Sequence, residues 1–357
     1  MLEKLTEQLK QRDSLTAAQV PLAVSQLVDE QVSAEIKAVF LTSLATKGET
    51  AEEILGFARE LRSLSVRPPL SPDTTAGEIL DVCGTGGDRL NTFNISTTVA
   101  IICAAAGIAV AKHGNRAVTS QAGSADVLEA LGIRVDLTPE QAARSLHEHD
   151  FAFFFAPKYH PAFRHIGLAR KLCADRGQRT IFNFLGPLLN PARPTAQLIG
   201  VPRPELCDPV ARVLQALGVR RGLVVSGNVA ADAVGRARYL DEFSTLGSNM
   251  VAEFYHEHAL SQSELNPKLF GVQPASLDDL TGGDREHNAE IVRRILRGED
   301  RGPKREAVLI NAAAALLVAA TADSMAEGWA FAAELIDTGA AYRKLEELIE
   351  ASASMTA

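Results

Sequence analysis

The sequence predicts an α/β protein in which a small, all-helical N-terminal unit precedes a larger unit built on a mainly parallel sheet. Two observations lead to this fold class. Residues 1–65 show only helical patterns, whereas short apolar strands alternate with helices from about residue 79 onward. A helix between two strands carries the chain back along the sheet, so the two strands run parallel and the helix packs on one face. Repeated alternation of this kind is typical of a mainly parallel sheet with helices on both faces. The length of 357 residues suits one large domain or two.

The N-terminal unit begins with an amphipathic helix, since Leu2, Leu5 and Leu9 fall on one helical face. Residues 66–78 are rich in proline, serine and threonine, which is typical of a connection between two units. We therefore expect two domains. The helical domain comprises residues 1–70 with a returning helical segment at about 165–195, and the α/β domain comprises residues 75–165 and 196–357.

The elements of the larger unit follow from apolar runs and from the residues that bound them. Gly107 and Gly132 each end an apolar helical run, and Thr138 followed by Pro139 is typical of a helix start. We expect strands at 79–83, 108–113, 133–137, 151–157 and 222–227, and helices at 95–107, 124–132, from 138, across 158–200, at 209–218 and from about 284 onward.

Composition excludes several functional classes. Acidic residues outnumber basic ones by 44 to 36, and a net charge of −8 is a poor match for general nucleic-acid binding. No apolar run reaches the roughly 20 residues that a membrane-spanning helix needs, and the charged N-terminus is unlike a signal peptide. The four cysteines form no CxxC pair, so neither a zinc site nor a disulfide framework is expected. We expect a cytoplasmic protein that binds neither nucleic acid nor membranes.

A glycine-rich loop follows the first strand and is the most informative segment. Residues 84–88 read Gly-Thr-Gly-Gly-Asp, and Asn94, Ser96 and Thr97 then stand at the start of an apolar helix. Glycines bring bare backbone N–H groups close to a ligand, and a helix N-terminus adds partial positive charge. The segment therefore predicts an anion site at the carboxyl end of a strand, where open α/β sheets bind ligands. It matches neither the Walker pattern nor GxGxxG.

A second polar loop follows the next strand. Lys112 is a compact cation at the strand tip, suited to a pyrophosphate oxygen, and Gly114 permits a sharp turn. Since neighbouring parallel strands end at the same sheet edge, we expect both loops to open onto one crevice. Further donors in this loop are Asn115, Arg116, Thr119, Ser120 and Ser124.

Five motifs together resemble one known family. They are the GTGGD loop, the NxST helix start, KHGNR, GSADxLEALG and TIFNxLGPLxNPA, and they occur in this order over roughly residues 1–340. The combination resembles anthranilate phosphoribosyltransferase, the tryptophan-pathway member of the nucleoside phosphorylase-like transferase fold. The resemblance implies transfer of a phosphoribosyl group from phosphoribosyl pyrophosphate to the amine of anthranilate.

The same resemblance implies the ligands of each substrate and of Mg²⁺. For anthranilate, the implied residues are Gly84, Asn115 and Arg170. For magnesium they are the Ser96 hydroxyl and the acidic pair Asp241 and Glu242, whose hard oxygens suit this ion. For phosphoribosyl pyrophosphate they are Gly84, Gly87, Asp88, Thr92, Asn94, Ile95, Ser96, Thr97, Lys112, His113, Gly114, Asn115, Arg116, Thr119, Ser120 and Ser124.

Two departures from the family pattern leave alternatives open. The link between the strand at 222–227 and Asp241 is several residues longer than in the family, so Asp232 could compete as an acidic ligand. The segment that follows Arg170 is also longer, which leaves Arg179 or Arg164 as alternatives for the anthranilate carboxylate.

The implied mechanism relies on positioning and on stabilisation of the leaving pyrophosphate by Mg²⁺, Lys112 and the loop donors. Lys112 is the expected catalytic residue. His113 is adjacent and is an alternative as proton acceptor, although a loop-shaping role is preferred. The resemblance also implies a homodimer formed through the helical unit. A pyrimidine nucleoside phosphorylase and a non-catalytic nucleic-acid-binding paralogue of the same fold are the competing functions.

Overall fold

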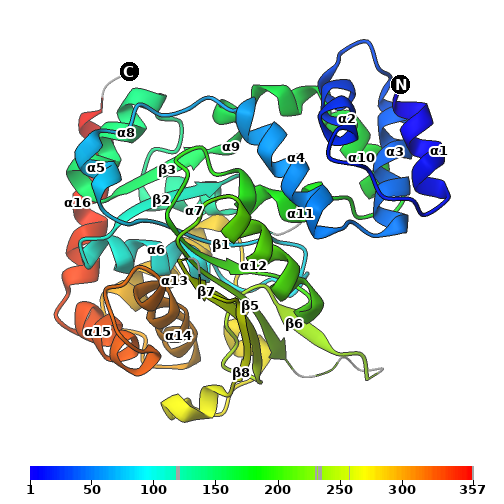
Figure 1. Cartoon of the computed structure of the whole chain (residues 1–357). Helices are drawn as coiled ribbons and strands as arrows, with labels where there is room; N and C mark the ends of the chain where they lie inside the picture. The colour runs from blue at the N-terminus through cyan, green and yellow to red at the C-terminus, as the bar shows by residue number, and fades with distance from the viewer. Residues whose placement is uncertain (118–120, 230, 232–234, 257, 356–357) are drawn as a thin grey trace.

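The computed structural model describes residues 1–117, 121–229, 231, 235–256 and 258–355 (Figure 1). Four helices form the N-terminal unit, and the connection to the sheet contains one short helix. A later segment returns to this unit, because α10 (Gly167–Asp175) packs against α3 and lies among the N-terminal helices in Figure 1. The N-terminal helices are α1 (Leu2–Lys10), α2 (Gln19–Val28), α3 (Ala34–Lys47), α4 (Ala51–Ser63) and α5 (Pro72–Ala76).

The described strands form one sheet in the order β3-β2-β1-β4-β5-β7-β8, with β6 paired to β5. The first five strands of this order are parallel, and the pairings of β5 with β6 and β7 and of β7 with β8 are antiparallel. The predicted mainly parallel α/β fold is thus confirmed. The strands are β1 (Ile79–Gly84), β2 (Ala109–Gly114), β3 (Phe151–Phe155), β4 (Ala196–Gly200), β5 (Arg221–Val229), β6 (Arg238–Leu240), β7 (Asn249–Tyr255) and β8 (Ser261–Leu265).

Helices cover both faces of the sheet, and the strand side chains alternate between two apolar clusters as a pleated strand requires. In β4, Leu198 joins a cluster with α6 and α14, whereas Ile199 joins the cluster that holds the N-terminal helices. That second cluster is continuous from Phe40 of α3 to Phe254 of β7, so the helical unit and one sheet face share a core. The remaining helices are α6 (Ile95–Ala105), α7 (Ser124–Leu131), α8 (Pro139–His149), α9 (Ala156–Tyr159), α11 (Phe182–Leu185), α12 (Cys207–Ala216), α13 (Arg285–Leu296), α14 (Pro303–Val318), α15 (Met325–Asp337) and α16 (Ala340–Ser354).

Two of the sequence-based element assignments are wrong. Residues 158–200 are not helical throughout, because their last five residues form β4, a wholly buried strand between β1 and β5. Residues 133–137 alternate buried and less buried side chains but form no strand. The backbone N–H of Arg134 instead donates to the Ser352 hydroxyl in α16, so a helix occupies the place of a strand partner.

The antiparallel strands β6, β7 and β8 were not foreseen. In β8 the residues are exposed and polar apart from Leu265, which gives no apolar signal to detect. Among the described residues, no helix is long and apolar enough to cross a membrane.

Candidate functional site

A cavity of about 540 Å³ opens at the carboxyl ends of β1 and β2. Because these strands are parallel neighbours, the loops that follow them leave the sheet at the same edge, as the sequence predicts. Residues from α10, from the 177–183 connection and from the segment after β6 complete its wall. The predicted site residues that line it are Gly84, Gly87, Asp88, Thr92, Asn94, Ile95, Ser96, Lys112, His113, Gly114, Asn115, Arg116, Ser124, Arg170, Asp241 and Glu242.

One described donor ligand of the prediction, Thr97, does not line this cavity. Thr97 is fully buried in the first turn of α6, and its hydroxyl has no hydrogen-bond partner among the described atoms. Thr119 and Ser120 lie outside the described residues. Asp232, the alternative acidic ligand, also lies outside them.

The glycine loop after β1 is held open by contacts with neighbouring strands. The Thr85 N–H donates to the Gly200 carbonyl of β4 at 2.9 Å. Gly86 and Gly87 have φ angles of +78° and +87°, a backbone region that glycine occupies without strain. The loop leads into α6, whose free N–H groups and dipole favour an anion. Asn94, which precedes α6, donates to the Ala122 carbonyl at 3.4 Å and so connects the two loops.

Lys112 is a buried cation directly beneath these loops. Its side chain is 1% exposed, and its ammonium donates to the Val82 carbonyl at 2.7 Å and the Ser96 hydroxyl at 3.2 Å. Burial lowers the pKa of Lys112, while the nearby Cys83 and carboxylates oppose that shift. An ammonium has three hydrogens, and two contacts leave one for an anion in the cavity.

His113 has a hydrogen-bonding pattern that argues against the proton-acceptor alternative. Its Nδ1 lies 3.2 Å from the Gly186 carbonyl, which can only accept, so the network assigns a hydrogen to Nδ1. Its bare Nε2 lies 3.2 Å from Nε2 of His160, which must then donate to it. Burial and the neighbouring His160 lower the pKa of His113 to about 3. A neutral ring whose acceptor nitrogen is occupied shapes the loop instead.

The second loop folds back onto α7. The Asn115 carbonyl accepts from the Ala125 N–H at 3.3 Å and from the Ser124 hydroxyl at 3.5 Å. Arg116 lines the cavity, but its guanidinium forms bonds of 2.5 and 2.7 Å with the Glu129 carboxylate. Two of its five N–H donors are thereby used, and others are available to a phosphate.

The acidic pair reaches the cavity because the long link before it forms a hairpin. β6 pairs with β5 so that Leu240 lies opposite Gly227, and Asp241 follows directly after this pair. The Asp241 carboxylate then accepts from the Gly86 N–H at 2.5 Å. A Cβ atom built on Gly84 would lie 2.4 Å from Asp241 Oδ2, so only glycine fits there.

Three carboxylates meet at this point without a matching number of cations. Burial and the charges of Asp88 and Glu242 raise the pKa of Asp241 well above its usual range. Burial raises the pKa of Glu242 to about 7, against the opposing effect of Lys112. Asp88 Oδ2 is buried without a partner among the described atoms. A divalent cation with hard-oxygen preference matches this arrangement.

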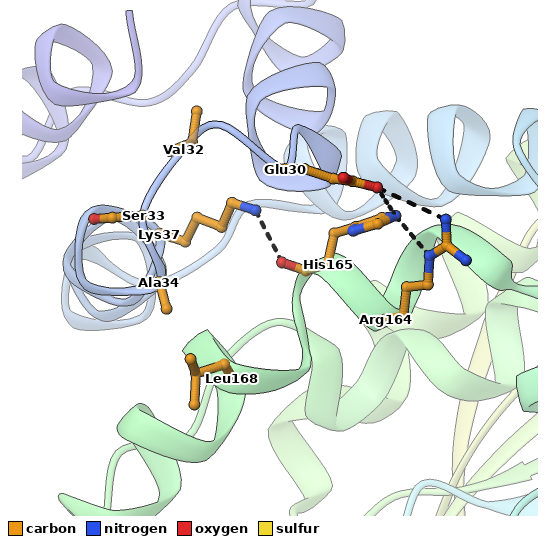
Figure 2. Close-up of a pocket in the computed structure, with 8 residues that line it drawn as sticks. All are labelled: Glu30, Val32, Ser33, Ala34, Lys37, Arg164, His165 and Leu168. Atoms are coloured by element: carbon orange, nitrogen blue, oxygen red, sulfur yellow. Dashed lines mark hydrogen bonds and ion pairs between the residues drawn. The ribbon is translucent and has the colours of Figure 1, made fainter.

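The structure places two of the three candidate arginines at this cavity. Arg170 of α10 lines the cavity, and its guanidinium lies 5.4 Å from the Phe182 ring centroid. Its side chain reaches solvent at the cavity mouth, yet burial of part of it lowers its pKa. Arg179 lines the same cavity. Arg164 lines a second cavity of about 430 Å³ in the helical unit, where it pairs with Glu30 at 3.7 Å (Figure 2).

Several cavity residues were missed by the sequence-based interpretation. Phe182 and Asn183 belong to the TIFNxLGP motif that was used only as a family signature. Gln178 comes from the segment whose extra length was noted. Across the described residues, no three or more His, Cys, Asp or Glu side chains form a metal cage by themselves, which is compatible with an ion that takes further ligands from phosphate and water.

Comparison with known proteins identifies the family of this chain. Residues 3–65 match the helical bundle domain of a glycosyl transferase family, and residues 76–342 match its a/b domain. Anthranilate phosphoribosyltransferase of Petrotoga mobilis is 44% identical over 95% of this chain and 93% of its own length. The enzyme of that name from a Geobacter species is 43% identical over 98% of both chains.

Solved structures give the same result. The crystal structure of anthranilate phosphoribosyltransferase from Thermus thermophilus has a TM-score of 0.86 and 37% identity, over 98% of this chain and 99% of its own. The Saccharomyces cerevisiae enzyme in complex with PRPP and Mg has a TM-score of 0.83 and 28% identity, over 99% of this chain and 98% of its own. The chain therefore belongs to the anthranilate phosphoribosyltransferase family.

Proposed function

We propose that this protein transfers the phosphoribosyl group of phosphoribosyl pyrophosphate to the amine of anthranilate, releasing pyrophosphate. The observation that carries the proposal is the single cavity onto which both glycine-bearing loops, Lys112 and the acidic pair open. The relatives support this enzyme. They give no support to a pyrimidine nucleoside phosphorylase or to a nucleic-acid-binding paralogue.

The donor site proposed here comprises the two loops. The Thr85 and Gly86 N–H groups already donate to Gly200 and Asp241. The N–H groups of Gly87 and Asp88 and of the start of α6 are therefore those proposed for the diphosphate. Lys112 has a hydrogen available for a leaving-group oxygen. The remaining donor ligands are those predicted from the sequence. Among them, Arg116 also pairs with Glu129, and Thr119 and Ser120 lie outside the described residues.

Mg²⁺ is the proposed cofactor, and the residues present fit it. The carboxylates of Asp241 and Glu242 and the Ser96 hydroxyl are hard oxygen ligands. Burial and neighbouring carboxylates raise the pKa values of the acidic pair, and a bound cation would offset both effects. When bound, the ion neutralises charge that develops on the departing pyrophosphate. Asp88 adds a third carboxylate beside this pair.

The acceptor site proposed here lies at the wall formed by α10. The guanidinium of Arg170 can grip a carboxylate with two parallel hydrogen bonds. It is held over Phe182 at 5.4 Å, which limits its orientation. Gly84 and Asn115 line the same cavity and complete the set expected to contact anthranilate.

Catalysis then consists of positioning and charge stabilisation. The bond between the anomeric carbon and the pyrophosphate oxygen breaks while the amine nitrogen bonds to that carbon and loses a proton. An aromatic amine is already a neutral nucleophile, so no strong general base is required. The burial of Lys112 strengthens its effect on the leaving group, because Coulombic interactions are larger in a low dielectric.

A homodimer, a cytoplasmic location and the two-domain division remain part of the proposal. Large apolar side chains are exposed on the helical unit, with Leu22 at 45%, Val39 at 42% and Leu168 at 61%. We propose this unit as the dimer interface, where a partner would cover these side chains. The proposed division keeps residues 1–70 and about 165–195 as the helical domain, and 75–165 with 196–357 as the α/β domain.

One assay tests the proposed function. Purified protein is mixed with Mg²⁺, phosphoribosyl pyrophosphate and anthranilate, and the loss of anthranilate fluorescence is followed together with pyrophosphate release. We expect both signals in equal amounts and neither without the donor. Phosphorolysis of thymidine in the presence of phosphate, with no loss of anthranilate, would instead establish the phosphorylase alternative.

A further inference from the structure

Arg179 links two parts of the molecule that are distant in sequence. It lies between α10 and α11, in the segment that returns to the helical unit. Its Nη2 donates to the Gly87 carbonyl at 2.8 Å, across 92 residues of chain. The glycine loop is thereby attached to the opposite wall of the cavity by a charged hydrogen bond.

The surroundings of Arg179 leave this carbonyl as its main fixed partner. In the described part of the chain, no carboxylate lies within ion-pair distance of its guanidinium. Burial and the positive charges of Arg203 and Arg89 lower its pKa, and only Asp88 opposes them. A guanidinium kept beside two other cations is in an unfavourable place unless an anion or a carbonyl stabilises it.

Its contact with Gly87 determines the orientation of one peptide group in the loop. The Gly87 carbonyl and the Asp88 N–H belong to the same planar trans peptide and point in opposite directions. With the carbonyl fixed by Arg179, the Asp88 N–H is directed to the other side of the loop. Gly87 has a φ of +87°, so without this bond the peptide can rotate at little steric cost.

We propose that Arg179 is a positioning residue for the sugar-diphosphate donor, which holds the Gly87–Asp88 peptide in the orientation that accepts the diphosphate. The inference rests on the proposed function and adds a residue outside the predicted donor set. It also differs from the alternative in which Arg179 binds the carboxylate of anthranilate. The two roles act on different substrates and are therefore separable by kinetics.

Three variants test the proposal. In Arg179→Ala the donor KM should rise about tenfold, the usual scale for one hydrogen bond to a charged group, while the anthranilate KM stays within twofold. Arg179→Lys should recover part of the loss, because an ammonium can still donate to the carbonyl. Arg203→Ala is the matched control, since it removes a cation near Arg179 without touching the loop, and both KM values should stay within twofold.

Calorimetric titration of the same variants with phosphoribosyl pyrophosphate and Mg²⁺, without anthranilate, measures donor binding directly. We expect the weakest binding by Arg179→Ala, intermediate binding by Arg179→Lys and wild-type binding by Arg203→Ala. Three results would overturn the inference. In Arg179→Ala the anthranilate KM could rise as much as the donor KM, or donor binding could stay at the wild-type level. Arg203→Ala could also weaken donor binding as much as Arg179→Ala does. Inactivity of the wild-type protein towards anthranilate with intact donor binding would refute the proposed function and leave this inference standing.

Discussion

Substitution of Gly84 by alanine should disable the acidic pair without unfolding the protein. The added Cβ would lie 2.4 Å from Asp241 Oδ2 and 2.7 Å from both its Cγ and its backbone oxygen. An ordinary contact begins at 3.4 Å, so the carboxylate has to move by about 1.0 Å, the difference between these distances. The Asp241 backbone also rests on Gly200, which leaves little room for retreat.

The size of the effect follows from this displacement. A misplacement of about 1 Å in a catalytic arrangement costs roughly 10²-fold in rate, or about 2.7 kcal/mol. We expect a fall of that size in kcat/KM at limiting Mg²⁺ and a rise in the Mg²⁺ concentration needed for half-maximal rate. Overpacking should lower the free energy of unfolding by about 1 to 3 kcal/mol.

The assay measures initial rates of anthranilate consumption across a Mg²⁺ titration at saturating donor. Gly77→Ala is the control, because no atom lies within 4 Å of its Cβ position and its φ of −88° suits alanine. If Gly84→Ala has the magnesium titration and kcat/KM of the wild type, the placement of Asp241 in the metal site is wrong.

Further predictions concern the other groups of the cavity. Lys112→Ala should lower kcat/KM by about 10²-fold or more in steady-state assays, and a near-wild-type rate would remove it from the mechanism. Asp241→Asn combined with Glu242→Gln should weaken the dependence on Mg²⁺, measured by titration, and an unchanged curve would point to another carboxylate. Arg170→Ala should raise the anthranilate KM far more than the donor KM, whereas equal effects would reject its assignment. Burial lowers the pKa of His160 to about 4. The stabilisation from the buried neutral ring is therefore fully present above the unfolded-state pKa of about 6.5, and it is lost as the pH falls towards 4. His160→Gln should therefore reduce the loss of unfolding free energy between pH 7 and pH 5, by about 2 kcal/mol in urea titrations, and an unchanged pH dependence would contradict the buried neutral ring.

The cavity could be predicted from the sequence because its signals are local. Glycines after an apolar strand, followed by a helix start with polar residues, identify the first loop from fewer than twenty consecutive residues. Lys112 follows from the same reasoning at the next strand end. Parallel neighbours end at one sheet edge, so two local patterns were enough to expect one crevice.

What could not be predicted depends on contacts between distant residues. The pairing of His113 with His160 and that of Arg179 with Gly87 have no sequence signature, because each joins segments separated by many residues. β4 was missed because its five residues follow a proline-rich stretch and include the polar Gln197. Its burial is decided by β1 and β5 on either side and not by its own composition.

The shared apolar core has a consequence for biosynthesis. A ribosome releases residues 1–63 first, but the core that buries them also needs Ile166, Cys173 and strand residues as late as Phe254. Since about 100 residues separate α4 from α10, the nascent helices wait roughly 5–20 s at 5–20 residues per second. Their apolar faces lack this part of the core during that interval, when a chaperone can cover them.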